Sequence, residues 1–232
     1  MSANAEVLHG AGMVGAAARE APVPRAEAVG TIGGWNPENF AREQIRGLVR
    51  RVFFAGGSRP VKQAVFSPVE LHSGVGGICD QVGRALALET HSDIAVLSRD
   101  AGPAVLWAHR DGAAIKPWAT QLAVNLWRVP ELSLWPSGEE IGTGCYWRAR
   151  LGELQNEFEY TVIQGPAAGV SSEAALLGQL ADGLILVLDA HSTRRAAALK
   201  IKETLQGAGT KILGTVLSER AFPVPEGIYR RL

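Results

Sequence analysis

The protein is a chain of 232 residues, 47% of them hydrophobic, with 23 basic and 23 acidic side chains. This length suits one α/β domain with some additional peptide, and the hydrophobic content suffices for a sizeable core. Because the charges balance, composition favours neither a nucleic-acid-binding protein nor an acidic tail, and no nucleic-acid partner is expected.

The first 35 residues, 1–35, are rich in Ala, Gly and Pro without sustained periodicity, which predicts a disordered tail. They lack the basic start and the apolar core of a signal peptide. No uninterrupted apolar run approaches the roughly 18 residues of a membrane helix. The cysteines, Cys79 and Cys145, lack metal-site spacing and are too few for a disulfide framework. We therefore expect a cytoplasmic protein, peripheral at the inner membrane at most.

A folded domain is expected over 36–232, and it begins with an amphipathic helix. In NPENFAREQIRGLVRRVF, the residues Phe40, Ile45, Leu48, Val49 and Val52 recur at helical spacing, with arginines between them. This pattern predicts a helix with one face packed on the core.

Six short apolar runs then alternate with helical stretches. Each run is typical of a parallel strand buried on both faces: VKQAVFS, SDIAVLS, AVNLWRV, EYTVIQG, DGLILVLD and TKILGTVL. The predicted helices between them are GICDQVGRALALE, RARLGELQNEF, EAALLGQLA and RRAAALKIKETLQ. This alternation predicts an α/β fold, a doubly wound and mostly parallel sheet with helices on both faces. Ligands of such sheets bind at the carboxyl ends of the strands.

A glycine-rich turn follows the first predicted strand, in FSPVELHSGVGGICDQVGRALALE over 66–89. The main-chain amides of Gly74, Gly76 and Gly77 could cradle a phosphate at the helix N-terminus. An ordinary tight turn is the simpler interpretation. GVGGIC also fits the dinucleotide fingerprint G-x-G-x-x-G, with Cys79 in the third glycine position and Asp100 about 20 residues further on.

The order of these elements, together with FEYTVIQGP and SSEAALLGQLADGLILVLDAHSTRRAAALKIKETLQGAGTKILGTVLSER, resembles a known family. The chain is similar over roughly 40–232 to the bacterial tyrosine kinases (BY-kinases) of CpsD and CapB type, which serve capsular and exopolysaccharide biosynthesis. These kinases are relatives of the P-loop ATPases of the MinD/ParA type. The resemblance implies a P-loop NTPase-like fold.

Several catalytic positions of that family are changed in this chain. Where the family's phosphate loop ends in Gly-Lys-Ser-Thr, Val75 replaces the lysine and Gly76 replaces the hydroxyl residue that would bind magnesium. One of two expected aspartates survives as Asp100, and the other is Ser98. The magnesium-organising aspartate is replaced by Gln164.

Two further positions differ from the family's pattern. Glu173 stands where the family has an aspartate, and Ser218 stands in place of an asparagine near the base. Phosphoryl transfer depends on positioning and on charge neutralisation by lysine and magnesium. The resemblance therefore implies a degenerate member, a pseudoenzyme to which no catalytic or metal-binding residue is assigned and in which Asp100 is a possible remnant of the site.

Such a protein would act as a regulatory or scaffold subunit. Its expected partners are an inner-membrane chain-length or export protein or an active kinase paralogue. ATP or ADP could still bind without the usual lysine and magnesium site. Two alternatives stay open: an active ATP-dependent protein-tyrosine kinase or ATPase with an atypical site, and a nucleotide or dinucleotide sensor that binds without hydrolysis.

Two peripheral motifs also derive from the resemblance. Glu43 and Arg46 match the family's Glu-x-x-Arg-x-x-Arg subunit motif, but the third position is Val49 with Arg50 beside it. The resemblance implies a homo-oligomer interface there, while a solvated helix face is equally compatible. At the C-terminus, Tyr229 stands alone where the family has a tyrosine cluster, and it is a candidate phosphorylation site.

The remaining aromatic and histidine residues carry little functional signal. Five of the six tryptophans lie within 107–147. Core packing is the favoured interpretation, and any exposed ones would suit a partner surface. His91, His109 and His191 are scattered along the chain and predict no metal cluster.

Overall fold

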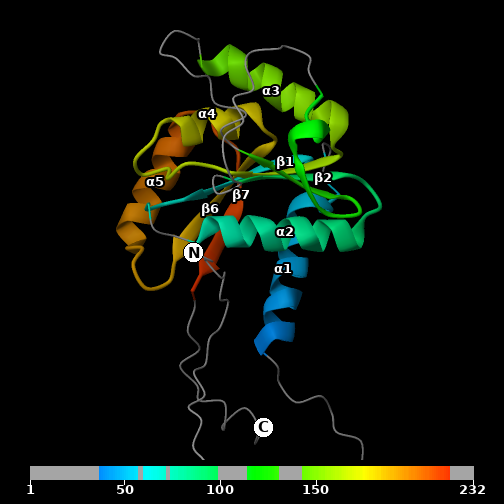
Figure 1. Cartoon of the computed structure of the whole chain (residues 1–232). Helices are drawn as coiled ribbons and strands as arrows, with labels where there is room; N and C mark the ends of the chain where they lie inside the picture. The colour runs from blue at the N-terminus through cyan, green and yellow to red at the C-terminus, as the bar shows by residue number, and fades with distance from the viewer. Residues whose placement is uncertain (1–36, 57–59, 72–73, 99–113, 131–142, 220–232) are drawn as a thin grey trace, which may run out of the picture.

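The computed structural model describes residues 37–56, 60–71, 74–98, 114–130 and 143–219. Helices cover both faces of a central sheet (Figure 1). The helices are α1 (Pro37–Phe53), α2 (Val75–Glu89), α3 (Thr143–Glu157), α4 (Glu173–Leu180) and α5 (Arg195–Gly207), with a short 3-10 turn at Lys116–Trp118. The strands are β1 (Gln63–Pro68), β2 (Ile94–Ser98), β3 (Thr120–Ala123), β4 (Leu126–Pro130), β5 (Tyr160–Gln164), β6 (Gly183–Asp189) and β7 (Ile212–Ser218).

The strands form one sheet in the order β3-β4-β2-β5-β1-β6-β7. Every neighbouring pair is parallel except β3 and β4, which are antiparallel. The predicted doubly wound α/β fold is thereby confirmed. Because β5 lies between β1 and β2, the connection through α2 crosses over one strand. This arrangement places the carboxyl ends of β1 and β5 side by side.

Two of the six apolar runs depart from the prediction of a single parallel strand buried on both faces. The run AVNLWRV contains a hairpin corner, because β3 ends at Ala123 and β4 begins at Leu126. Asn125 fixes this corner by donating from Nδ2 to the carbonyls of Ala87, Thr90 and Ser92, at 3.1–3.2 Å. At the opposite side of the sheet, β7 is an edge strand whose side chains are mostly half-buried or exposed.

The core has two parts, one on each face of the sheet. The helix residues Ile45, Val49 and Val52, predicted to face the core, pack together with α2 against β1 and β6. On the other face, α3 and α4 pack through residues such as Trp147 and Leu177, joined by Leu205 of α5. Burying a side chain of this size stabilises the fold by about 1.5–3 kcal/mol.

The tryptophans do not share one environment. Trp147 is buried in the core, whereas Trp118 is 48% exposed. Trp107 and Trp135 lie outside the described residues. Among the described residues, no helix combines the length and the hydropathy needed to span a bilayer.

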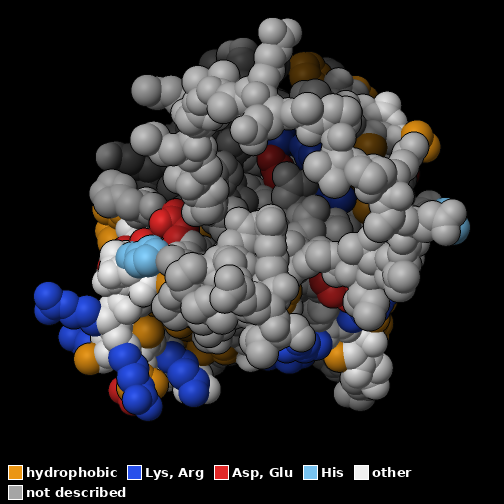
Figure 2. Space-filling view, turned by 90° about the horizontal axis from the view of Figure 1, so that it is seen from below, with side chains coloured by type: hydrophobic (Ala, Val, Ile, Leu, Met, Phe, Trp, Pro, Cys, Tyr) orange, Lys and Arg blue, Asp and Glu red, His pale blue; other side chains and the backbone are white. Residues whose placement is uncertain are grey.

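The outer face of α5 is basic. Arg194, Arg195, Lys200 and Lys202 are all exposed on it or at its start. In the space-filling view from below, Lys and Arg side chains gather on the flank that carries this helix (Figure 2). Helix α5 contacts β7, which β6 separates from β1 in the sheet.

Candidate functional site

The candidate site lies where β1 and β5 end and α2 begins. Gly74 is the N-cap of α2, and it supplies no side-chain hydrogen bond to the helix. The first-turn amides of a helix have no intrahelical acceptor, so an uncapped N-terminus offers donors to an anion. Of the three predicted phosphate-loop glycines, Gly74 precedes the helix, and Gly76 and Gly77 lie in its first turn.

The chain that leaves β1 bends at Val69 and Glu70 but stays hydrogen-bonded to its neighbours. The N–H of Val69 donates to the carbonyl of Val187 on β6 at 3.1 Å. On the other side, the N–H of Ala168 donates to Pro68 at 2.8 Å and that of Gly169 to Val69 at 3.2 Å. A Cβ at Gly169 would lie 2.6 Å from the Val69 carbonyl oxygen, so the two backbones are in close contact.

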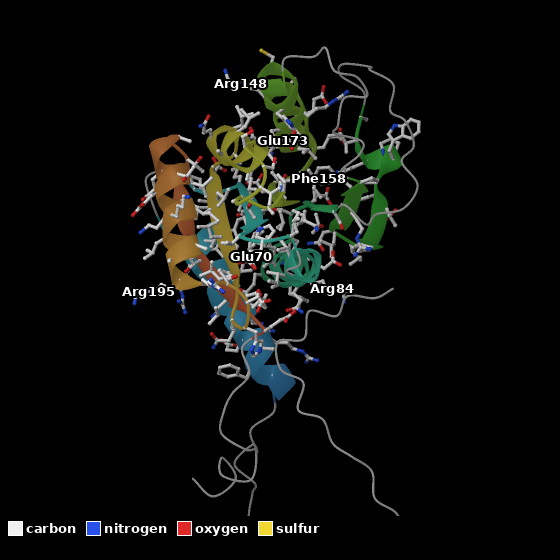
Figure 3. All side chains as sticks on the ribbon, turned by 90° about the vertical axis from the view of Figure 1, so that its left-hand side faces the viewer. Glu70, Arg84, Arg148, Phe158, Glu173 and Arg195 are labelled. Carbon is white, nitrogen blue, oxygen red and sulfur yellow. The ribbon has the colours of Figure 1, made fainter. Side chains whose placement is uncertain are left out.

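This pairing engages the N–H of Val69, which is therefore not available to an anion, while the carbonyls of Pro68 and Val69 accept hydrogen bonds from the neighbouring chain. Glu70, which follows Val69, places an acidic side chain on the same segment (Figure 3). The N–H groups in the first turn of α2 are donors that an anion could use in the described part of the loop.

Val75, which the resemblance sets at the family's lysine position, faces the hydrophobic core. Its side chain is 2% exposed and belongs to the cluster that joins α1, α2, β1 and β6. A side chain in this orientation cannot reach back over the loop. Position 75 therefore contributes packing energy and no positive charge.

Gly76 and Gln164 are in close contact across the gap between α2 and β5. A Cβ added to Gly76 would lie 3.2 Å from Gln164 Oε1 and 3.5 Å from its Nε2. The carboxamide thus occupies the space beside the first turn of α2 where a hydroxyl side chain at position 76 would lie. The resemblance sets Gly76 and Gln164 at the family's two magnesium-binding positions. The two residues are spatially matched, since the absence of a side chain at Gly76 makes room for the carboxamide of Gln164.

The dinucleotide alternative conflicts with the topology. In the classic dinucleotide-binding fold the first two strands are neighbours, whereas here β5 separates β1 from β2. The dinucleotide fingerprint also requires its third glycine where the helix packs closely on a strand, but here that close packing occurs at Gly83 and not at Cys79. A Cβ at Gly83 would lie 2.3 Å from Val96 Cγ2 on β2, while Cys79 is a buried core residue and burial raises the pKa of its thiol.

The other predicted site residues have separate surroundings. Asp100 and Tyr229 lie outside the described residues. Glu173 is the first residue of α4, and its N–H donates to Ser171 Oγ at 3.2 Å. Ser218 donates from its hydroxyl to the Leu188 carbonyl at 3.0 Å, so this group is engaged within the sheet.

The predicted interface residues lie on α1 and form contacts within the chain. Glu43 and Arg46 pair with each other at 3.8 Å, and both side chains are about half-exposed or more. Arg50 instead reaches Glu89 at the end of α2, at 3.1 Å. That contact links two helices of the same molecule, and it gives Arg50 a structural role independent of any oligomer.

Two charged groups near the site were not singled out by the sequence. Asp80 of α2 pairs with Arg128 of β4 at 2.6 Å in a partly buried contact. Among the described residues, Asp80 Oδ1 and Arg128 Nε have no hydrogen-bond partner. The long separation of the two residues along the chain hides their contact from sequence patterns.

Asp189, at the end of β6, organises the turn before α5. Its carboxylate accepts from the His191 N–H at 2.7 Å and from the Ser192 hydroxyl at 2.8 Å. These hydrogen bonds, the first above all, lower the pKa of Asp189. The sequence could have indicated this turn, because Asp189 ends an apolar run and is followed by AHST over 190–193. Asp and Ser side chains commonly form hydrogen bonds with nearby backbone groups in turns.

Metal-binding side chains do not converge in the described part of the chain. No group of three or more His, Cys, Asp and Glu residues is arranged there to hold a metal ion. Beside the first turn of α2, the described contacts are the carboxamide of Gln164 at Gly76 and the apolar cluster that holds Val75.

No family model matches the chain. It is 31% identical over 97 residues to tyrosine-protein kinase CpsD of Streptococcus agalactiae serotype III, covering 39% of this chain and 42% of that protein. It is 27% identical over 94 residues to the putative tyrosine-protein kinase CapB of Staphylococcus aureus, covering 40% and 41%. The matched region therefore spans about two-fifths of these relatives.

Solved structures share the fold over most of the chain. The kinase domain of Escherichia coli tyrosine kinase ETK aligns with a TM-score of 0.60 and 14% identity, covering 80% of this chain and 79% of that one. The chimerical protein CapA2B2 gives 0.57 and 17%, covering 75% and 83%. The MinD cell division protein of Aquifex aeolicus gives 0.52 and 13%, covering 73% and 72%. The chain is thus a relative of the CpsD and CapB proteins with a MinD-like P-loop NTPase fold.

Proposed function

We propose that the chain is a catalytically degenerate relative of the BY-kinases that serves as a regulatory or scaffold subunit in capsular or exopolysaccharide biosynthesis and export. The observation that carries the proposal is the burial of Val75 in the core at the lysine position. The contact between Gly76 and Gln164 supports it, because both members of the expected magnesium pair are replaced together.

The chemistry follows from these residues. Phosphoryl transfer needs positive charge at the phosphates and a metal ion that bridges them. In the described site, a buried valine and a neutral carboxamide take the places of the lysine and the metal-binding carboxylate. What remains is the N-terminus of α2, whose amides and dipole could hold an anion but would contribute little to its transfer.

The scaffold role would be exercised through partners. The proposed partners are an inner-membrane chain-length or export protein and an active kinase paralogue, either of which would hold the chain at the cytoplasmic side of the membrane. The similarity to CpsD and CapB supports this assignment, since both names describe tyrosine kinases and the fold is shared with kinase domains.

A second candidate is a nucleotide sensor that binds without hydrolysis. The uncapped start of α2 favours it, because its first-turn amides are the donors that a phosphate group would use. The two candidates differ in whether a nucleotide binds, and both differ from an active kinase in turnover.

The test combines binding and turnover on the same preparation. Thermal unfolding is recorded with and without ATP, ADP and NAD, each with Mg²⁺, and phosphate release is measured against a blank without enzyme. Ligand at 100 times its Kd adds about 2.7 kcal/mol of stability, a clear rise in Tm. We expect no turnover. A Tm rise with ATP or ADP alone favours the sensor, and turnover or phosphorylation of Tyr229 by the purified chain overturns the degenerate assignment.

A further inference from the structure

The outer edge of β7 has no strand partner among the described residues. The sheet ends at this strand, which pairs only with β6. Leu217 on β7 is 50% exposed, and Thr215 is exposed as well. An uncovered edge presents unpaired N–H and C=O groups that readily accept another strand.

An apolar groove runs beside this edge, between β7 and α1. Its volume is about 370 Å³, and the apolar residues lining it include Phe40, Leu48, Val52, Leu213, Val216 and Leu217. The groove and the strand edge are continuous, so a single extended peptide could cover both.

The hydrogen bonds of β6 show which β7 groups face outward. The N–H of Ala190 donates to the Ser218 carbonyl at 3.0 Å, so the backbone of Ser218 faces β6. Backbone direction alternates along a strand. The N–H and C=O groups of Leu217 and Thr215 therefore face away from β6, toward the open edge.

The chain itself continues from this point with thirteen residues, RAFPVPEGIYRRL, that lie outside the described part. Pro223 and Pro225 are two residues apart, so in an extended strand both ring nitrogens lie on the same side. Proline is tolerated in a strand where that side faces solvent. The opposite side then carries the donors of Phe222, Val224 and Glu226, which is the pattern of an edge strand.

We propose that residues 222–226 add to β7 as an antiparallel edge strand and cover the groove beside α1. Matching the donors to the outward groups pairs Phe222 with Leu217 and Val224 with Thr215. Phe222 then shares a face with the half-exposed Leu217, while Pro223 and Pro225 share the face of Val216, which packs toward α1.

The geometry of the last described residue agrees with a reversal of the chain. Glu219 has φ +55°, the only positive φ outside glycine in the described residues. Such left-handed residues are typical of tight connections between antiparallel strands. The pairing leaves residues 218–221 as the connection, and connections of this length are common in hairpins. At about 3.3 Å per residue, the rest of the chain is also long enough to follow β7 over its whole length.

Amide hydrogen exchange of the full chain, followed by NMR, tests the proposal with a matched pair of variants. Val224→Pro removes a donor that faces β7, whereas Pro225→Val changes a residue whose nitrogen faces away. We expect the amides of Thr215 and Leu217 to be protected in the wild type and in Pro225→Val. In Val224→Pro they should exchange at least about tenfold faster, while β1 and β6 amides stay protected.

Each other occupant of the edge gives a distinct result. If the Thr215 and Leu217 amides exchange as fast in the wild type as in Val224→Pro, the edge is not covered by this segment and the proposal is wrong. If their protection falls on dilution, together with a dimer seen by light scattering, the strand comes from a second copy and the intramolecular pairing is wrong. Protection that survives dilution and is lost only in Val224→Pro supports the proposal.

Discussion

Replacing Val75 with lysine asks directly whether this position faces the core or the phosphate loop. Because the side chain is 2% exposed, the variant loses most of the transfer energy of a buried valine, about 1.5–3 kcal/mol. The ammonium group must then be buried without a partner or must force the first turn of α2 to rearrange, at a cost of several kcal/mol. We expect a total loss of about 3–5 kcal/mol.

Urea unfolding followed by tryptophan fluorescence measures this loss. Val75→Ala is the matched control, because it removes apolar contacts without adding a charge, and it should cost about 1–3 kcal/mol. For a chain of this size each kcal/mol corresponds to a Tm shift of about 2–4 °C, so lysine should lower the Tm by roughly 10 °C.

The opposite outcome is equally informative. A Val75→Lys protein with wild-type stability, and with a Tm that ATP now raises, would show that position 75 faces the loop. The reasoning from core burial would then be wrong, and a single substitution would have restored the phosphate-binding lysine.

Three further predictions follow from other contacts. Gly76→Ser should cost about 1 kcal/mol more stability in the wild-type background than in the Gln164→Ala background, because the serine meets the carboxamide only when Gln164 is present. Equal costs in the two backgrounds, measured as a double-mutant cycle, would exclude the contact. Gly83→Val should lower stability by at least about 2 kcal/mol in urea unfolding, since even its Cβ would lie 2.3 Å from Val96 Cγ2, and an unchanged midpoint would contradict the close packing of α2 on β2. Folding lowers the pKa of Asp189 below its ordinary value of 3.8, so the stability that its ionised carboxylate contributes is complete above pH 3.8 and is lost as the pH falls through the lower folded pKa. The difference in unfolding free energy between the wild type and Asp189→Asn should therefore shrink over that pH range. A difference that does not depend on pH would contradict the role of these hydrogen bonds.

Much of the fold could be predicted because it depends on local patterns. Each of the six apolar runs overlaps a strand, and each predicted helical stretch overlaps a helix. The hairpin at Asn125 was missed because AVNLWRV reads as one continuous apolar run, while its turn is fixed by distant carbonyls of Ala87, Thr90 and Ser92. The exposure of β7 was missed because sequence gives no strand order, and an edge strand and a central strand can have the same composition.

The candidate site was only partly accessible from sequence. The substitutions at Val75, Gly76 and Gln164 could be read from the resemblance, but the fit of the carboxamide against the glycine required three-dimensional placement. The same holds for the ion pair of Asp80 with Arg128, which joins an α2 residue to a strand far along the chain. Contacts of this kind depend on topology, and topology is not encoded in any short motif.

The position of β1 in the sheet also has a consequence for synthesis on the ribosome. Its two neighbours come late in the chain, with Gln63 opposite Thr161 on β5 and Ala64 opposite Gly183 on β6. A growing chain that has not yet produced β6 therefore leaves β1, an apolar strand, with at least one bare edge. Folding dominated by such distant pairings is slow and exposed to aggregation. Fragments that end before Gly183 should therefore depend on chaperones, however complete their first helices are.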